Sequence, residues 1–219
     1  MDWRQWLRWM VAGFGCSGVL SPCVATEAFQ PTPLGLPPVI APRDNPPSRA
    51  KVELGKALFF DRRLSADGTI RCASCHDPKR VFTDGNPVSK GVHAARGTRN
   101  APSLINVAYA TTLFWDGRRD TLESQVKDPF VNPIEHGLHD QATLVRRIRN
   151  DARYRRQFTR VFGIQPQQIS MDHVVKAIAC FERTLIAGDS PFDRFEYGGD
   201  RQALSASARR PSSSSTARP

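Results

Sequence analysis

The five residues Cys72-Ala-Ser-Cys75-His76 constrain this chain more than any other feature of its sequence. Two thiols separated by two residues can both form thioethers with the vinyl groups of one porphyrin, and the histidine that follows can supply the proximal iron ligand. A redox dithiol does not need the histidine. A zinc site needs a second C-x-x-C or H-x3–5-H pair, which the sequence lacks. The pattern therefore predicts one covalent haem c held by Cys72, Cys75 and His76.

The N-terminal segment has the composition of an export signal. Arg4 and Arg8 precede the uncharged apolar run 9–20, and residues 23–25 place small side chains at a cleavage site. The run is too short to span a membrane. Because haem c is attached outside the cytoplasm, residues 1–25 are predicted to be a signal peptide, and the protein is predicted to be periplasmic without a membrane span.

Three cysteines lie outside the haem motif. Cys16 and Cys23 belong to the predicted signal peptide and leave with it, unless one of them carries a lipid anchor, which Pro22 disfavours at Cys23. Cys180 is then an odd thiol within a helical pattern. It is predicted to be a buried structural thiol.

The charge of the chain is less extreme than it looks at first. The 219 residues carry a formal net charge of +10, but residues 201–219 hold four Arg and no acid, and residues 1–25 hold two Arg and one Asp, which leaves +5 on residues 26–200. No basic stripe interleaved with aromatic side chains is present, so a nucleic-acid partner is not expected. A modest positive charge suits docking of an acidic redox protein.

Composition divides the rest of the chain into an arm, one domain and a tail. Residues 26–47 contain seven prolines and are expected to form an extended arm. Residues 48–208 are long enough for one domain with a core of its own and are predicted to form the haem domain. Residues 209–219, rich in Ser and Arg, are predicted to be a disordered tail.

Apolar periodicity indicates helices and no strands, so the predicted fold class is all-α. Ser48 and Ser170 are expected to cap two helices, the second with Val174, Ile178, Phe181 and Leu185 on one face. Residues 77–100 are expected to be a long functional loop. The remaining predicted helices cover residues 101–110, 121–126, 141–150 and 152–162, the last ended by Gly163.

Six segments occur in the order of one known family: residues 53–76, Gly97-Thr-Arg-Asn-Ala-Pro-Ser-Leu104, Phe114-Trp-Asp-Gly-Arg118, Asn132-Pro-Ile-Glu135, Phe181-Glu-Arg-Thr-Leu185 and Asp189-Ser-Pro-Phe-Asp193. Over about residues 47–208 the chain strongly resembles the N-terminal, peroxidatic haem domain of bacterial di-haem cytochrome c peroxidases and their MauG relatives. The resemblance implies a cytochrome c-like domain with long irregular loops.

The resemblance also implies roles for individual residues. His76 would be the proximal ligand of the peroxidatic haem, and Trp115 would lie on the electron route between two haems. Glu135 would be the acid/base carboxylate over the distal face, and Asn100 would belong to a calcium site between the domains. Without that context, Glu135 could equally be a solvated loop residue, and a tryptophan such as Trp115 is more often a core aromatic. Asp116 and Arg118 are expected to be a structural charge pair or partners of the haem propionates.

The implied activity is reduction of hydrogen peroxide, with electrons from a small cytochrome or cupredoxin donor. Heterolysis of the O–O bond needs a proton on the leaving oxygen, and one carboxylate can carry it there. The alternatives are a mono-haem electron-transfer cytochrome c, for which Met171 is a poor sixth ligand, and a MauG-like enzyme that oxidises a partner protein. Family members are often homodimers.

The chain departs from the family at the distal histidine. Val92 occupies that position, and His93, one place away, is expected to be a solvated loop histidine. An open or water-bound sixth site is therefore predicted. His136, His139 and His173 are expected to be ordinary surface or helix histidines, with His136 as the second candidate proton group because it follows Glu135.

The C-terminal residues depart from the family as well. From Pro211 onward a Ser-rich segment replaces the expected continuation into a second haem domain. Our hypothesis is that a frameshift truncates a di-haem protein. The alternative is a natural disordered tail on a mono-haem protein. Truncation would leave an apolar face exposed and impair donor-dependent turnover.

Overall fold

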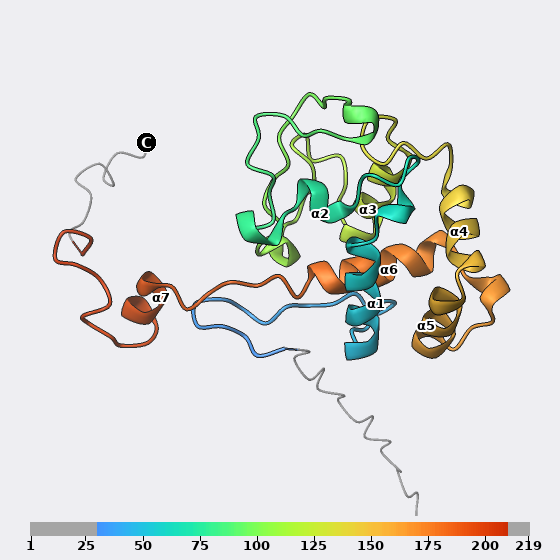
Figure 1. Cartoon of the computed structure of the whole chain (residues 1–219). Helices are drawn as coiled ribbons and strands as arrows, with labels where there is room; N and C mark the ends of the chain where they lie inside the picture. The colour runs from blue at the N-terminus through green and yellow to red at the C-terminus, as the bar shows by residue number, and fades with distance from the viewer. Residues whose placement is uncertain (1–29, 210–219) are drawn as a thin grey trace, which may run out of the picture.

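The structure, a computed structural model, describes residues 30–209 and contains seven α-helices joined by long irregular segments (Figure 1). Within these residues no strand forms, and only three isolated β-bridges occur, which confirms the all-α prediction. The predicted signal peptide and all of the predicted tail except Arg209 lie outside the described residues. The helices are α1 (Arg49–Phe59), α2 (Cys72–Cys75), α3 (Leu122–Val131), α4 (Gln141–Asn150), α5 (Ala152–Phe162), α6 (Met171–Glu182) and α7 (Pro191–Glu196).

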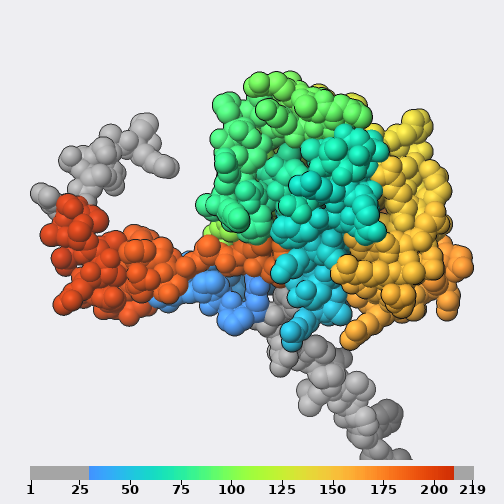
Figure 2. All heavy atoms as spheres, viewed as in Figure 1, coloured from blue at the N-terminus to red at the C-terminus, as the bar shows by residue number. Residues whose placement is uncertain are grey.

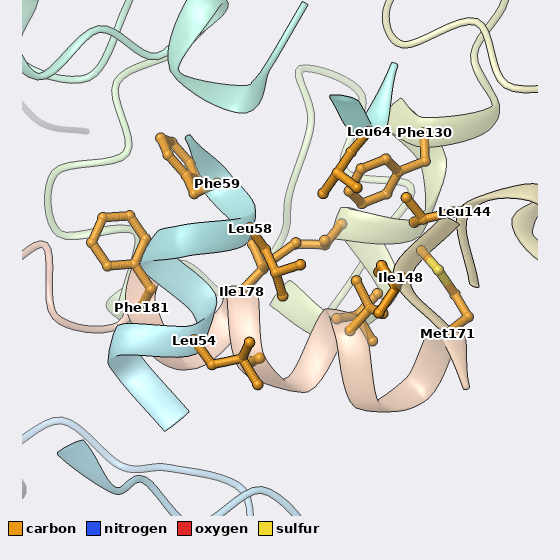
Figure 3. Packing of buried hydrophobic residues seen from close by; sticks show 14 of the residues in the cluster. Leu54, Leu58, Phe59, Leu64, Phe130, Leu144, Ile148, Met171, Ile178 and Phe181 are labelled. Carbon is orange, nitrogen blue, oxygen red and sulfur yellow. The ribbon is translucent and has the colours of Figure 1, made fainter. Parts of the chain in front are cut away.

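Helices α1 and α6 form the centre of the core (Figure 3). Both begin where the sequence predicts: the Ser48 hydroxyl accepts a hydrogen bond from the Lys51 amide at 3.2 Å, and Ser170 precedes the first turn of α6. Phe59 of α1 meets Phe181 of α6 edge to face, with ring centroids 5.1 Å apart. Cys180 is buried in this core, as predicted.

A glycine allows the two helices to touch backbone to backbone. A Cβ built on Gly55 of α1 would lie 1.9 Å from the carbonyl oxygen of Ala177 on α6. No side chain fits there without a shift of one helix. The third helix of this layer, α3, packs on α6 and buries Leu122, Val126 and Phe130.

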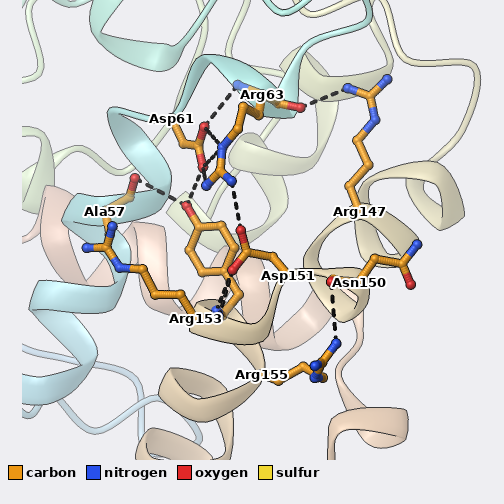
Figure 4. A network of polar contacts seen from close by, with 9 residues as sticks. Ala57, Asp61, Arg63, Arg147, Asn150, Asp151, Arg153 and Arg155 are labelled. Carbon is orange, nitrogen blue, oxygen red and sulfur yellow. Dashed lines mark hydrogen bonds and ion pairs between the residues drawn. The ribbon is translucent and has the colours of Figure 1, made fainter.

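The predicted helix pair is also confirmed. Helices α4 and α5 are capped by the carboxylates of Asp140 and Asp151, and α5 ends at Gly163, whose φ of 67° is left-handed. A polar network joins this pair to the turn after α1 (Figure 4): Arg63 binds Asp61 at 2.6 Å and Asp151 at 2.7 Å. The network anchors the chain just before it enters α2.

Residues 101–110 do not form the predicted helix. Only Val107–Tyr109 form a single 3-10 turn, and Asn106 has a left-handed φ of 61°. Asn106 pairs instead with the chain after α6: its amide donates to the Leu185 carbonyl at 2.7 Å, and its side chain bonds to Ala187. These long-range bonds outcompete the local helix. The helix predicted over 121–126 exists and continues to Val131 as α3.

Helix α7 stands apart from the helical body beside the N-terminal arm (Figures 1 and 2). The Asp189 amide donates to the Leu34 carbonyl at 2.9 Å, and the Tyr109 hydroxyl donates to the Pro37 carbonyl at 2.8 Å. These bonds tie the arm to both the α7 segment and the body.

None of the helices within residues 30–209 has the length and apolar character needed to cross a membrane.

The contact at Gly55 yields a stability prediction. Gly55→Ala should lower the free energy of unfolding by about 1–3 kcal/mol, because the added methyl group forces α1 away from α6. Urea unfolding followed by circular dichroism measures this change. Lys56→Ala, on the exposed face of the same helix, is the matched control and should change stability by less than about 0.5 kcal/mol. Equal stability of Gly55→Ala and wild type would contradict the contact.

Candidate functional site

A cavity of about 740 Å³ lies between α2, α3 and the irregular loops drawn in green in Figure 1. Cys75 and His76 line it at the end of α2, and Glu135 lines it beyond the end of α3. Much of the remaining lining is apolar and comes from the segment that was wrongly predicted as a helix and from the loop after it. These apolar residues include Leu104, Ile105, Val107, Leu113 and Phe114.

Two backbone carbonyls orient the imidazole of His76. Its Nδ1 lies 3.0 Å from the Phe82 oxygen and 3.1 Å from the Pro102 oxygen. Because both groups accept hydrogen bonds, Nδ1 carries the proton, and the lone pair of Nε2 is left free to bind a metal. Burial lowers the pKa of His76, which keeps the imidazole neutral.

The loop that supplies one of these carbonyls has an unusual backbone. Val81 and Phe82 both have a φ of 57°, a left-handed conformation that is uncommon for residues with a Cβ. Ser103 holds this loop from the other side, since its hydroxyl donates to the Val81 carbonyl. The strain is therefore maintained by surrounding contacts and fixes the acceptor for His76.

These residues fit a haem c. The two cysteines are free thiols on one helical turn, the neutral imidazole next to them offers an unpaired nitrogen, and the adjoining cavity is apolar on several sides. Burial raises the pKa of the Cys75 thiol to about 11, so this thiol is protonated at neutral pH and has little nucleophilic character of its own. A redox-active dithiol would instead need a thiol whose pKa is lowered, so that the thiolate is present at neutral pH.

Glu135 is half-buried at the edge of the same cavity. The Asn132 amide group donates to Glu135 Oε1 at 2.7 Å and fixes the carboxyl group. Burial nevertheless raises the pKa of Glu135, because desolvation outweighs this bond and the positive charge of Arg118. A solvated loop glutamate would not show this shift. The role of Asn132 was missed in the sequence, although its place three residues before Glu135 is a recognisable turn signal.

A second close backbone approach holds the Glu135 loop in place. The Val92 amide donates to the carbonyls of Ile134 and Glu135, both at 3.1 Å. A Cβ on the preceding Gly91 would lie 1.6 Å from the Ile134 oxygen, so the position requires glycine. The loop predicted over 77–100 thus supports the carboxyl side of the cavity as well as the imidazole side.

Trp115 is 60% exposed, so its interpretation as a core aromatic is wrong. Its indole N–H donates to the Asn100 carbonyl at 3.0 Å. The neighbouring ion pairs are Arg118 with Asp116 at 2.9 Å and Arg99 with Asp116 at 3.1 Å, and they hold the pKa of Asp116 down at about 2. The predicted charge pair of Asp116 and Arg118 is therefore present, and Arg118 also lines the cavity.

The calcium ligand predicted at Asn100 stays a prediction. Asn100 is exposed and lies at the cavity rim. Among residues 30–209 no three His, Cys, Asp or Glu side chains gather in a way that would hold a metal ion.

The histidines fall into two groups. His93 is exposed, pairs with Asp67 at 3.5 Å and does not line the cavity, as expected for a solvated loop residue, and Val92 is buried. His139 is exposed and His173 lies in the first turn of α6. His136 was predicted to be an ordinary surface or helix residue, which is wrong. It is 4% exposed, with its ring centroid 4.8 Å from that of Phe130.

Comparison with known proteins places these features in one family. The family model for di-haem cytochrome c peroxidases matches residues 49–202. The chain is 41% identical over 170 residues to the methylamine utilization protein MauG of Methylophilus methylotrophus, covering 78% of this chain and 50% of the relative. It is 38% identical to the cytochrome c peroxidase Ccp of Escherichia coli, covering 92% of this chain and 40% of that protein.

Solved structures agree with this relationship. A MauG-like protein associated with microbial copper homeostasis superimposes with a TM-score of 0.69 and 41% identity, covering 75% of this chain and 48% of that chain. The dihaem peroxidase BthA from Burkholderia thailandensis gives a TM-score of 0.60 at 29% identity over 68% of this chain and 42% of that one. The chain spans about half the length of the curated relatives it matches. By its sequence and its fold, this chain belongs to the di-haem cytochrome c peroxidase family.

Proposed function

We propose that this chain carries one haem c on Cys72, Cys75 and His76 and reduces hydrogen peroxide in the periplasm, with electrons from a small redox protein. The observation that carries the proposal is a half-buried carboxyl group of raised pKa, Glu135, in the same cavity as a neutral, oriented His76. When bound, the haem supplies an iron that coordinates peroxide and exchanges electrons.

Glu135 supplies the proton chemistry. Its carboxylate accepts the proton of a peroxide in the cavity and returns it to the oxygen that leaves as water. A raised pKa suits both steps, because the ionised group is then a better base and the protonated group can donate its proton to the leaving oxygen. Asn132 keeps the carboxyl group in place between the two transfers.

His76 and Trp115 support the same function from two other sides. The carbonyls of Phe82 and Pro102 hold Nδ1–H of His76 and strengthen its other nitrogen as a ligand. Trp115 lies at the surface beside the cavity, where an indole ring offers a route for electrons between a redox partner and the site.

A MauG-like oxidation of a partner protein is the second candidate, and the identity of 41% with a MauG protein favours it. An electron carrier has less support. It needs a sixth protein ligand, and Met171 is 8% exposed within the main core cluster rather than at the cavity (Figure 3).

Expression in a periplasm that attaches haem tests the proposal. The product is expected to be coloured, to carry the mass of one porphyrin and to consume peroxide when a small chemical reductant is supplied. A colourless product at the mass of the apoprotein would refute the assignment of Cys72, Cys75 and His76.

Glu135→Gln should lower the rate of peroxide reduction by about 10²–10⁴-fold, because an amide cannot relay the proton. Haem content and the spectrum of the resting protein should stay unchanged. In the wild type, the rate should fall as the pH drops through the raised pKa of Glu135, since the base is then already protonated. Glu196→Gln, an exposed change on α7, is the control. Full activity of Glu135→Gln would rule out the relay.

The sixth iron site should be open or hold water. The oxidised holoprotein is expected to show a high-spin spectrum and to bind cyanide quickly, and His93→Ala should leave both unchanged, because His93 does not line the cavity. A low-spin wild type that becomes high-spin in His93→Ala would contradict this prediction.

A further inference from the structure

Glu182, at the C-terminal end of α6, is a buried acid with no role in the chemistry above. Its side chain is 5% exposed, and its Oε2 has no hydrogen-bond partner among the described residues. Carboxyl groups are almost never fully buried unless they are paired. An unpaired one therefore requires an explanation.

The charges around Glu182 are engaged elsewhere. The guanidinium group of Arg183 forms two bonds with Glu123 of α3, at 2.7 and 2.9 Å. Burial raises the pKa of Glu182 to about 8, the negative charge of Glu123 adds to this shift, and Arg183 opposes it.

Glu182 and Cys72, one of the two proposed haem-attachment residues, belong to the same region of the core. Cys72 packs against the core cluster that contains Phe181 and Leu185, on either side of Glu182 along the chain. Burial raises the pKa of the Cys72 thiol, and the next largest cause is the negative charge of Glu182. In the proposed holoprotein Cys72 would be bonded to the porphyrin edge and not to the iron, so the charge of Glu182 would act on the haem through this part of the core.

We infer that Glu182 is a redox-linked proton site, which takes up one proton from solvent when one electron enters the haem and releases it on reoxidation. The inference rests on the proposed haem attachment. In the balanced step, an external reductant gives one electron to ferric iron, and the Glu182 carboxylate binds one proton to become the neutral acid. The net charge of the buried unit is thereby conserved.

The physical reason is the low dielectric around this group. Ferric iron in a porphyrin carries one more positive charge than ferrous iron and stabilises a nearby carboxylate. Reduction removes that charge and leaves an unpaired, buried carboxylate, whose desolvation is then uncompensated. Proton uptake removes this cost. The group therefore binds its proton more tightly in the reduced protein than in the oxidised one.

Redox titration of the holoprotein at several pH values tests the inference. The midpoint potential of the wild type should fall as the pH rises through the region around pH 8. In Glu182→Gln this dependence should be lost and the potential at alkaline pH should be higher than in the wild type, because no carboxylate forms there. Glu196→Gln is the matched exposed control and should follow the wild type.

Glu135 also has a raised pKa and needs its own comparison. The Glu135→Gln holoprotein should retain the alkaline pH dependence, and the double variant should lose it. Retention of the wild-type dependence in Glu182→Gln would overturn the inference.

A second measurement does not depend on any variant folding. Reduction of the wild-type holoprotein in weakly buffered solution near pH 8 should consume protons, detected with an indicator dye. A wild type that takes up no proton on reduction would also overturn the inference. A coloured, peroxide-reducing protein with a potential independent of pH would defeat only this inference, whereas a colourless protein would defeat the proposed function.

Discussion

The backbone contact between α1 and α6 at Gly55 and Ala177 determines how the rest of the domain is arranged. Helix α1 leads through the turn at Asp61–Arg63 into α2, which carries the two cysteines and is followed directly by His76. Helix α6 supports α3 on another side, and α3 ends at the turn that carries Glu135. The two sides of the cavity are therefore placed by one pair of closely packed helices, and any change in their separation moves the imidazole relative to the carboxyl group.

Backbone carbonyls, rather than regular secondary structure, then set the fine geometry of the site. The carbonyls of Phe82 and Pro102 hold His76, and those of Ile134 and Glu135 accept the Val92 amide. Such carbonyls are available because the loops are irregular, with left-handed residues next to the site. This arrangement explains why a helical domain devotes so much of its length to irregular chain around the cavity.

A half-buried acid, Glu135, and a buried one, Glu182, serve different purposes in the proposed scheme. Glu135 opens onto the cavity and is held by Asn132, so it can exchange protons with a substrate. Glu182 does not line the cavity, is buried in the core and has an oxygen without a hydrogen-bond partner among the described residues, so it can respond to charge but not touch substrate. Burial raises the pKa of both groups, yet their exposure to the cavity separates their roles.

The sequence by itself predicted the haem-attachment residues, the capping serines of α1 and α6, the extents of α4 and α5 and the apolar face of α6, because these depend on neighbours a few positions apart. The family motifs pointed to Glu135 and Trp115. Only the tertiary structure decided that Asn106 pairs with Leu185 instead of continuing a helix, that Trp115 is exposed and that His136 and Glu182 are buried. Each of these depends on contacts between segments far apart in the chain, and local pattern carries no information about which distant surface will cover a side chain.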